Sequence, residues 1–145
     1  MLKQNQKQKS SMVQILRNDD VQIKNIYHIS DIHIKNEQIF VNEYEHVFKQ
    51  FYDIIAKEKE SSVLVITGDI LDKSEFVSKF CIGLLSKFLT TLTNYIDIVC
   101  IQGNHDISIQ NGQIYDNLED LVNYDGVYYI PNSGFYIYNN LLFCH

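Results

Sequence analysis

The sequence predicts an α/β fold in which parallel strands alternate with helices, and three observations support this. Residues 26–29, 63–66 and 96–101 are short apolar runs with the length and composition of strands. The segments between them repeat apolar residues every three or four positions, which is typical of amphipathic helices. The strands recur about every 35 residues, a spacing that suits right-handed parallel crossovers.

The order of elements begins with a polar tail at residues 1–20, followed by one domain at residues 21–145. The first eleven residues are mostly Gln, Lys, Asn and Ser, which bury too little apolar surface to offset the entropy lost on ordering. A chain of 145 residues is long enough for a single core. The run at 63–66 has no polar interruption, so we expect this strand to be covered on both faces.

Each predicted helix follows one strand and precedes the next. We expect the second helix to begin after residues 72–75, where Asp72 and Glu75 can form a capping box. After Asn104 we expect a short helix at residues 115–122 and a closing hairpin whose strands, 135–138 and 141–144, flank a turn at 139–140. The helical stripes consist of Val41, Tyr44, Phe48, Phe51 and Ile55 in the first helix, and of Phe76 or Val77, Phe80, Leu84, Phe88 and Leu92 in the second.

The composition excludes several classes of protein. Hydrophobic residues make up 46% of the chain and charged residues 21%, as in globular domains and unlike disordered ones. We expect no membrane association, because no apolar run approaches the roughly 20 residues that span a bilayer. The net charge of −6 argues against electrostatic binding to nucleic acid. Three dispersed cysteines, Cys81, Cys100 and Cys144, indicate free thiols and an intracellular protein, cytoplasmic or nuclear.

Polar motifs follow all three predicted strands. They are Asp31-Ile32-His33 after the first strand, Gly68-Asp69 after the second, and Gly103-Asn104-His105-Asp106 after the third. Because the carboxyl ends of parallel strands face a common crevice, we expect these side chains to meet there. Carboxylate, imidazole and amide ligands suit divalent ions such as Mn²⁺, Fe²⁺ or Zn²⁺.

Together these motifs resemble those of the calcineurin-like metallophosphoesterase family over about residues 26–106. The resemblance implies a β-sandwich flanked by helices and built from βαβαβ units. It also implies that Asp31 and His33 hold one metal, that Asp69 bridges two metals, and that Asn104 binds the second. His105 resembles the family's catalytic histidine beside the reacting phosphate, and we expect Asp106 to hold its ring.

Within the family, the motifs look most like the SbcD-type branch of DNA double-strand-break-repair exonucleases. That resemblance implies a two-metal phosphoesterase acting on phosphodiester bonds, most simply with Mn²⁺, as a DNA exonuclease or endonuclease-like repair nuclease. The implied partners are DNA, a second copy of the chain and an SMC-like ATPase. The sequence departs from that branch at Asp72, where the branch usually has a histidine.

The sequence also lacks the late G-H-x-H stretch that completes the second metal site in this family, so we expect a domain that is incomplete at its C-terminus. His145 follows an apolar strand and is a candidate for the first late histidine. Two alternatives to a nuclease stay open. One is a phosphomonoesterase or nucleotide phosphodiesterase that uses the same site, and the other is a non-catalytic scaffold with an incomplete metal site.

Overall fold

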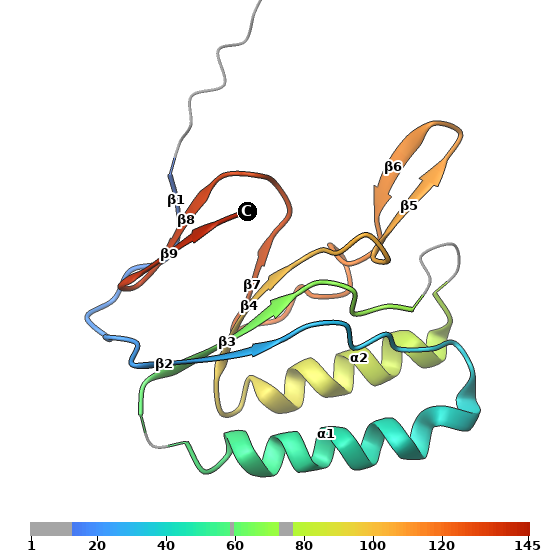
Figure 1. The fold of residues 1–145 in the computed structure, drawn as a ribbon, viewed down its shortest axis with the longest axis horizontal. Coiled ribbons are helices and arrows are strands. Elements are labelled where there is room, and N and C mark those ends of the chain that lie inside the picture. The colour runs from blue at the N-terminus through green and yellow to red at the C-terminus, as the bar shows by residue number, and fades with distance from the viewer. Residues whose placement is uncertain (1–12, 59, 73–76) are drawn as a thin grey trace, which may run out of the picture.

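The computed structural model describes residues 13–58, 60–72 and 77–145 (Figure 1). The described elements are two helices, one short 3-10 helix and nine strands, which form three sheets. In chain order they are β1 (Gln14–Arg17), β2 (Asn25–Ile29), η1 (Gln38–Phe40), α1 (Val41–Ile55), β3 (Ser62–Thr67), α2 (Lys79–Leu92), β4 (Asp97–Ile101), β5 (Ile107–Gln110), β6 (Gln113–Asp116), β7 (Val127–Ile130), β8 (Phe135–Tyr138) and β9 (Leu141–Cys144).

The main sheet is entirely parallel and confirms the predicted α/β class. Its strand order is β2-β3-β4-β7, so the three predicted strands are neighbours. In the central strand, Leu64 lies opposite Tyr27 of β2 and Ile98 of β4. Both helices lie along one face of this sheet (Figure 1). All three polar motifs therefore leave the sheet at the same edge.

A second sheet, β1-β8-β9, covers the opposite face. Successive side chains of a strand point to opposite faces, and β3 uses both. Leu64 and Ile66 belong to the core beneath the helices, whereas Val63 and Val65 pack with Tyr136 and Tyr138 of the second sheet. The prediction that this strand is covered on both faces is confirmed, with helices on one side and a sheet on the other.

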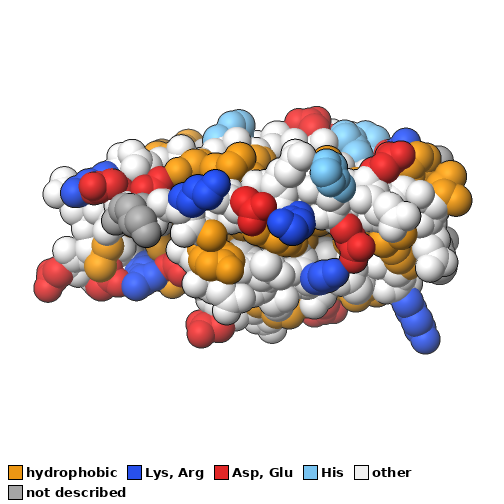
Figure 2. Space-filling model, turned by 90° about the horizontal axis from the view of Figure 1, so that it is seen from below, with side chains coloured by type: hydrophobic (Ala, Val, Ile, Leu, Met, Phe, Trp, Pro, Cys, Tyr) orange, Lys and Arg blue, Asp and Glu red, His pale blue; other side chains and the backbone are white. Residues whose placement is uncertain are grey.

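The helices pack through the aromatic residues of the predicted stripes. Phe48 of α1 and Phe88 of α2 are buried, and their ring centroids lie 4.2 Å apart. The helical face of the molecule carries Lys and Arg side chains close to Asp and Glu side chains, with hydrophobic side chains between them (Figure 2). This mixed surface agrees with the absence of an excess of positive charge in the sequence.

The predicted start of α2 is wrong. The helix begins at Lys79, and its N-cap is Ser78, whose Oγ accepts a hydrogen bond from the amide of Cys81 at 3.2 Å. Glu75 lies outside the described residues, but Asp72 lies too far from Lys79 along the chain to cap this helix. Ser at the N-cap position satisfies an amide of the first turn that has no partner within the helix. Asp72 therefore does not cap α2.

The segments outside the main sheet correct two further predictions. Residues 115–122 do not form the predicted helix, because β5 and β6 pair in a hairpin whose turn, Asn111-Gly112, has positive φ at both positions. Residues 14–17, placed in the predicted tail, form β1, which pairs with β8, while residues 1–12 lie outside the described part.

The predicted closing hairpin is confirmed as β8 and β9. Of the two turn residues, Asn139 has a positive φ of 51°, as expected. Asn140 instead binds the backbone of Ile23, whose amide donates to its Oδ1 at 2.7 Å and whose carbonyl accepts from its Nδ2 at 3.1 Å. Within the described ranges, neither helix has the length and apolarity needed to cross a membrane.

Candidate metal centre

The loops that follow β2 and β3 run side by side beyond the ends of the strands. The Asp31 amide donates to the Gly68 carbonyl at 3.2 Å, and the His33 amide donates to the Asp69 carbonyl at 3.0 Å. The Ile34 amide then donates to the Ile70 carbonyl at 2.8 Å. These bonds continue the parallel pairing, so the first two motifs are held in register by backbone hydrogen bonds.

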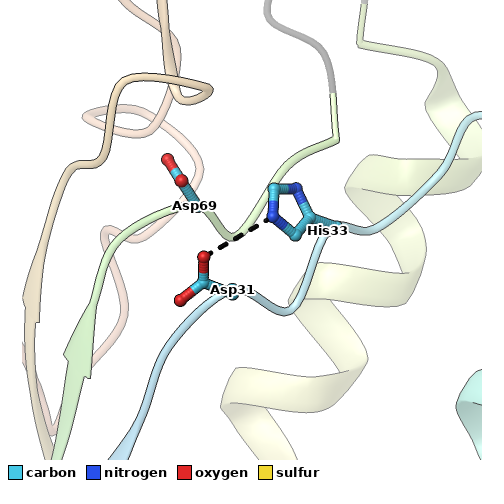
Figure 3. A group of neighbouring side chains, drawn as sticks. All are labelled: Asp31, His33 and Asp69. Atoms are coloured by element: carbon cyan, nitrogen blue, oxygen red, sulfur yellow. Dashed lines mark ion pairs between the residues drawn. The ribbon is translucent and has the colours of Figure 1, made fainter.

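Side chains from these two loops form a cluster with the composition of a metal site (Figure 3). Asp31, His33 and Asp69 each offer one ligand atom, and these atoms lie within 4.8 Å of one another. Donor atoms on opposite sides of an ion at ordinary bond lengths would be about 4.2 Å apart, so small side-chain rotations would close the cluster around a cation. His33 directs Nε2 toward Asp31, at 3.7 Å from Oδ1, which makes Nε2 the nitrogen available to an ion. The predicted convergence is observed for these three side chains, which come from the first two motifs.

The backbone at the cluster is unusual in the same three residues. Asp31, His33 and Asp69 have φ angles of 57°, 48° and 51°, in the left-handed region. They account for three of the five non-glycine residues with positive φ in the described part of the chain. Such conformations cost energy and concentrate at functional sites. A donor set of two carboxylates and one imidazole, held in this way, fits a divalent cation.

Two glycines allow the loops after β3 and β4 to approach each other closely. Gly68 has a φ of +92°, and a Cβ at this position would overlap the backbone of Gly103. A Cβ on Gly103 would overlap the carboxylate of Asp69. The glycines that begin the second and third motifs therefore serve a packing purpose, because any side chain at Gly103 would displace Asp69.

Asp106 ties the third motif to the second. Its side chain is fully buried and accepts hydrogen bonds from the amides of Gly103 at 2.8 Å, Leu71 at 2.9 Å and Ile70 at 3.3 Å. Burial raises the pKa of this carboxyl group, and the three amides act in the opposite direction. The prediction that Asp106 holds the ring of His105 is wrong, because Asp106 instead fixes the loop backbone.

His105 lies where the three motifs meet. Its backbone amide donates to Asp69 Oδ1 at 3.0 Å, and its Nδ1 lies 2.6 Å from the carbonyl oxygen of Asp72. The hydrogen bond to this carbonyl raises the pKa of His105, and the neighbouring carboxylates act in the same direction. A carbonyl is only an acceptor, so Nδ1 carries a proton and Nε2 is the nitrogen left to face a bound ligand.

Two candidate ligands remain, Asn104 and His145. Asn104 is exposed in the turn between β4 and β5, directly after Gly103, and its role as a ligand of a second ion stays a prediction. His145 extends the β8–β9 hairpin, exchanging two backbone hydrogen bonds with Gly134 at 2.9 and 3.1 Å. It is not a member of the acidic and histidine cluster found among the described residues.

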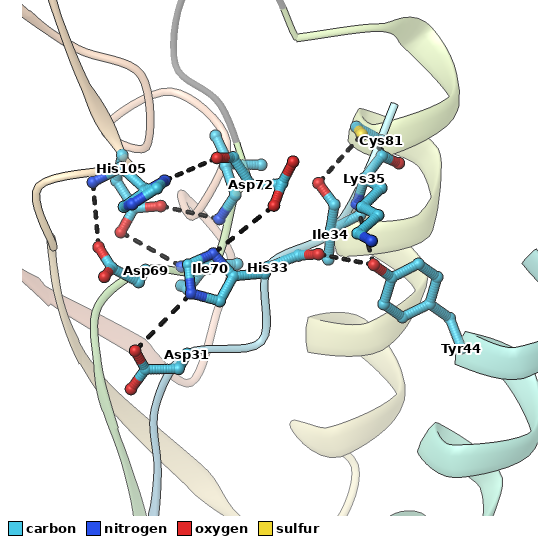
Figure 4. A network of polar contacts seen from close by, with 12 residues as sticks. Asp31, His33, Ile34, Lys35, Tyr44, Asp69, Ile70, Asp72, Cys81 and His105 are labelled. Carbon is cyan, nitrogen blue, oxygen red and sulfur yellow. Dashed lines mark hydrogen bonds and ion pairs between the residues drawn. The ribbon is translucent and has the colours of Figure 1, made fainter. Parts of the chain in front are cut away.

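Sequence reasoning missed two residues that contact the first loop (Figure 4). Tyr44 of α1 donates its hydroxyl hydrogen to the His33 carbonyl at 2.6 Å and accepts from the Lys35 amide at 3.0 Å. The sequence places Tyr44 on the apolar stripe of the first helix. A tyrosine hydroxyl in such a position needs a polar partner, and this requirement is the signal that could have found it. Asp72 is the other residue, and its carboxylate lies near the ring of His33.

A groove of about 490 Å³ adjoins the cluster on the side of the helices. Asp31, Lys35 and Glu43 supply its polar lining, and the ammonium group of Lys35 lies 4.6 Å from the centre of the Phe40 ring. The apolar lining residues are Ile29, Ile32, Phe40, Tyr44, Val47, Phe48, Phe51 and Phe88. The groove therefore offers an aromatic surface next to one of the candidate ligands.

Comparisons with known proteins agree with this geometry. The family model described as calcineurin-like phosphoesterase matches residues 24–145, which include all three motifs. An uncharacterized protein of Acanthamoeba polyphaga mimivirus is 36% identical over 135 residues, covering 88% of this chain and 10% of that protein. The chain thus spans about a tenth of the length of this curated relative.

Proposed function

Because the chain belongs to the calcineurin-like phosphoesterase family, we propose that it uses two divalent ions to hydrolyse phosphodiester bonds. The observation that carries this proposal is the cluster of Asp31, His33 and Asp69, whose ligand atoms lie within 4.8 Å of one another at the sheet edge. Bound divalent ions would polarise the phosphoryl group and neutralise the charge that develops on its oxygens. Carboxylate and imidazole donors suit several divalent ions, and we propose Mn²⁺ as the first ion to test, with Fe²⁺ and Zn²⁺ as alternatives.

In this proposal the residues divide the work as follows. Asp31 and His33 would hold one ion, Asp69 would contribute its carboxylate to both ions, and Asn104 would hold the second. The amide of His105 keeps Asp69 oriented by its hydrogen bond to Oδ1, at 3.0 Å. The ring of His105, fixed through Nδ1 by the Asp72 carbonyl, would present Nε2 toward the substrate. In its imidazolium form, which the raised pKa of His105 favours, the ring could donate the Nε2 proton to the leaving oxygen and remain protonated on Nδ1.

The proposal can be tested by measuring the hydrolysis of bis(p-nitrophenyl) phosphate, a generic phosphodiester, by the purified chain with Mn²⁺. The Asp69→Asn variant should lose at least about 100-fold in hydrolysis, because an amide cannot bridge two cations as a carboxylate does. Asp53→Asn is the matched control, since Asp53 lies exposed on α1 and pairs with Lys49 at 3.2 Å. Equal hydrolysis by the wild type and the Asp69 variant would contradict the bridging role.

Among phosphodiesters, we propose DNA as the substrate, with cleavage of the exonuclease or endonuclease type that serves repair. The order of the motifs supports this choice through their similarity to the SbcD-type branch. The chain's net charge of −6 implies that bound ions, a second copy or an SMC-like ATPase would supply the attraction for DNA. Mn²⁺-dependent degradation of linear DNA at rates well above those for aryl phosphates is the expected outcome.

One observation favours a second candidate, a nucleotide phosphodiesterase or phosphomonoesterase. The groove beside Asp31 is lined by aromatic rings that could stack on a base or an aryl group. Faster turnover of nucleotides or p-nitrophenyl phosphate than of DNA would select this candidate. A non-catalytic scaffold is the third possibility, and elemental analysis separates it, since a scaffold would hold one ion or none where the proposed enzyme holds two.

A further inference from the structure

Asp72 occupies a central place in the site although it is neither a predicted ligand nor the cap of a helix. Its amide donates to the Ile34 carbonyl at 3.2 Å, and its carbonyl accepts from His105 Nδ1 at 2.6 Å. Its backbone is thus tied to both neighbouring loops. Figure 4 shows its side chain directed toward the ring of His33.

One nitrogen of the His33 ring is buried without a hydrogen bond in the described part of the chain. Nε2 faces Asp31 and the candidate ion position, whereas Nδ1 is buried and has no hydrogen-bond partner within the described residues. A buried polar atom without a partner is costly and calls for an explanation. The carboxylate oxygen Oδ1 of Asp72 lies 3.9 Å from this nitrogen, too far for a hydrogen bond but within reach of a small side-chain rotation.

We propose that Asp72 is a positioning residue that accepts a hydrogen bond from Nδ1–H of His33 and thereby presents Nε2 to a divalent ion. Histidine ligands of metals almost always donate their second ring hydrogen to a carboxylate, carbonyl or water, which fixes the tautomer and the orientation of the ring. The T-shaped contact between His33 and His105, with ring centroids 4.9 Å apart, limits the ring further. Asp72 therefore serves both histidines, one through its carboxylate and the other through its carbonyl.

The proposed role of Asp72 can be tested without measuring hydrolysis. The inference rests on the proposed function for the identity of the ion, but the tautomer of His33 can be read in the metal-free chain. Long-range ¹H–¹⁵N NMR spectra of the imidazole groups distinguish a ring protonated at Nδ1 from one protonated at Nε2. His105 provides an internal control, because its partner is a backbone carbonyl that side-chain substitutions at position 72 leave in place.

In the wild type we expect His33 to carry its hydrogen on Nδ1. In Asp72→Ala the ring of His33 should populate both tautomers while His105 keeps its hydrogen on Nδ1, and Mn²⁺ affinity measured by calorimetry should fall about 10- to 100-fold. Asp72→Asn retains an acceptor oxygen and should fall between the two. Asp53→Asn should match the wild type in both measurements.

Two results would overturn the proposal. One is an unchanged His33 tautomer in Asp72→Ala, whatever happens to Mn²⁺ affinity, since a loss of affinity alone would mean that Asp72 acts through its charge or as a direct ligand. The other is a His33 ring protonated at Nε2 in the wild type. If the wild type binds no Mn²⁺, the proposed function fails, while the tautomer measurement still decides the role of Asp72.

Discussion

The interior of the domain and the edge that carries the site are stabilised by different interactions. Between the helices and the main sheet, side chains such as Leu64, Phe88 and Leu89 are almost fully buried and form only apolar contacts. At the site, strained backbone, two glycine contacts and the carboxylate of Asp106 fix the loops. Stability should therefore depend mainly on the volume of the core, and ion binding on a few polar contacts. Variants that change one property without the other test this difference.

The largest effect on stability should come from Phe88→Ala in the core. Phe88 is 1% exposed and contacts the rings of Phe48, Phe51 and Tyr52. Truncation should lower the free energy of unfolding by about 3–5 kcal/mol, measured by urea denaturation, because it removes apolar burial and leaves a cavity. The folded fraction of this variant should bind Mn²⁺ with the wild-type affinity. A loss of Mn²⁺ affinity would contradict the view that the core and the site are stabilised by different interactions.

Asp106→Ala should come next and should affect both properties. It leaves the amides of Gly103, Ile70 and Leu71 without their acceptor, so we expect a loss of about 3 kcal/mol in the free energy of unfolding. Mn²⁺ affinity should fall as well, since the second and third motifs lose their connection. Asp106→Asn retains one acceptor oxygen and should lose less. An unchanged Mn²⁺ affinity in Asp106→Ala would show that the loops do not need this link.

Gly103→Ala should separate the site from the core most clearly. The new Cβ would overlap the carboxylate of Asp69, and relieving that overlap should cost about 2 kcal/mol of stability. The displaced carboxylate should weaken Mn²⁺ binding at least about tenfold. Gly83→Ala is the matched control, because a Cβ at this helical position meets nothing within 4 Å. Equal Mn²⁺ affinity in the two variants would contradict the proposed contact.

Ser78→Ala should have the smallest effect and should leave the site intact. Ser78 caps α2 through its hydrogen bond to the Cys81 amide. Its loss should cost about 1 kcal/mol in thermal or urea denaturation. Calorimetry with Mn²⁺ should give the wild-type affinity. A change of several-fold would mean that the start of α2 helps to shape the loops at the site.

The sequence was sufficient to predict the main sheet because its strands are uninterrupted apolar runs and its helices have clear stripes. It was also sufficient to bring the first two motifs together, since parallel strands end at one edge. It was not sufficient for the hairpin at residues 107–116, whose second strand overlaps the start of the helix predicted at residues 115–122. The Asn111-Gly112 pair favours a two-residue hairpin turn and could have indicated the hairpin.

The contacts of Asp106 and Asp72 with other loops could not be predicted from sequence patterns. Asp106 and Asp72 were assigned as the partner of His105 and as a helix cap, both reasonable for their positions in sequence. Asp106 binds the Gly103 amide three positions away, but its other partners are amides of Ile70 and Leu71, 36 and 35 positions away. Asp72 contacts the rings of His105 and His33, 33 and 39 positions away. Such contacts depend on how the three loops pack against one another. The spacing of residues within one motif does not indicate this packing.

The left-handed backbone of Asp31, His33 and Asp69 has a consequence for how this domain diverges. At these φ angles glycine avoids the Cβ clash that costs other residues about 1 kcal/mol each, and asparagine tolerates the conformation better than most. A copy in which these three side chains are not needed would thus gain stability by exchanging them for Gly. A homologue with glycine at position 31, 33 or 69 would keep the fold and lack one of the proposed metal ligands.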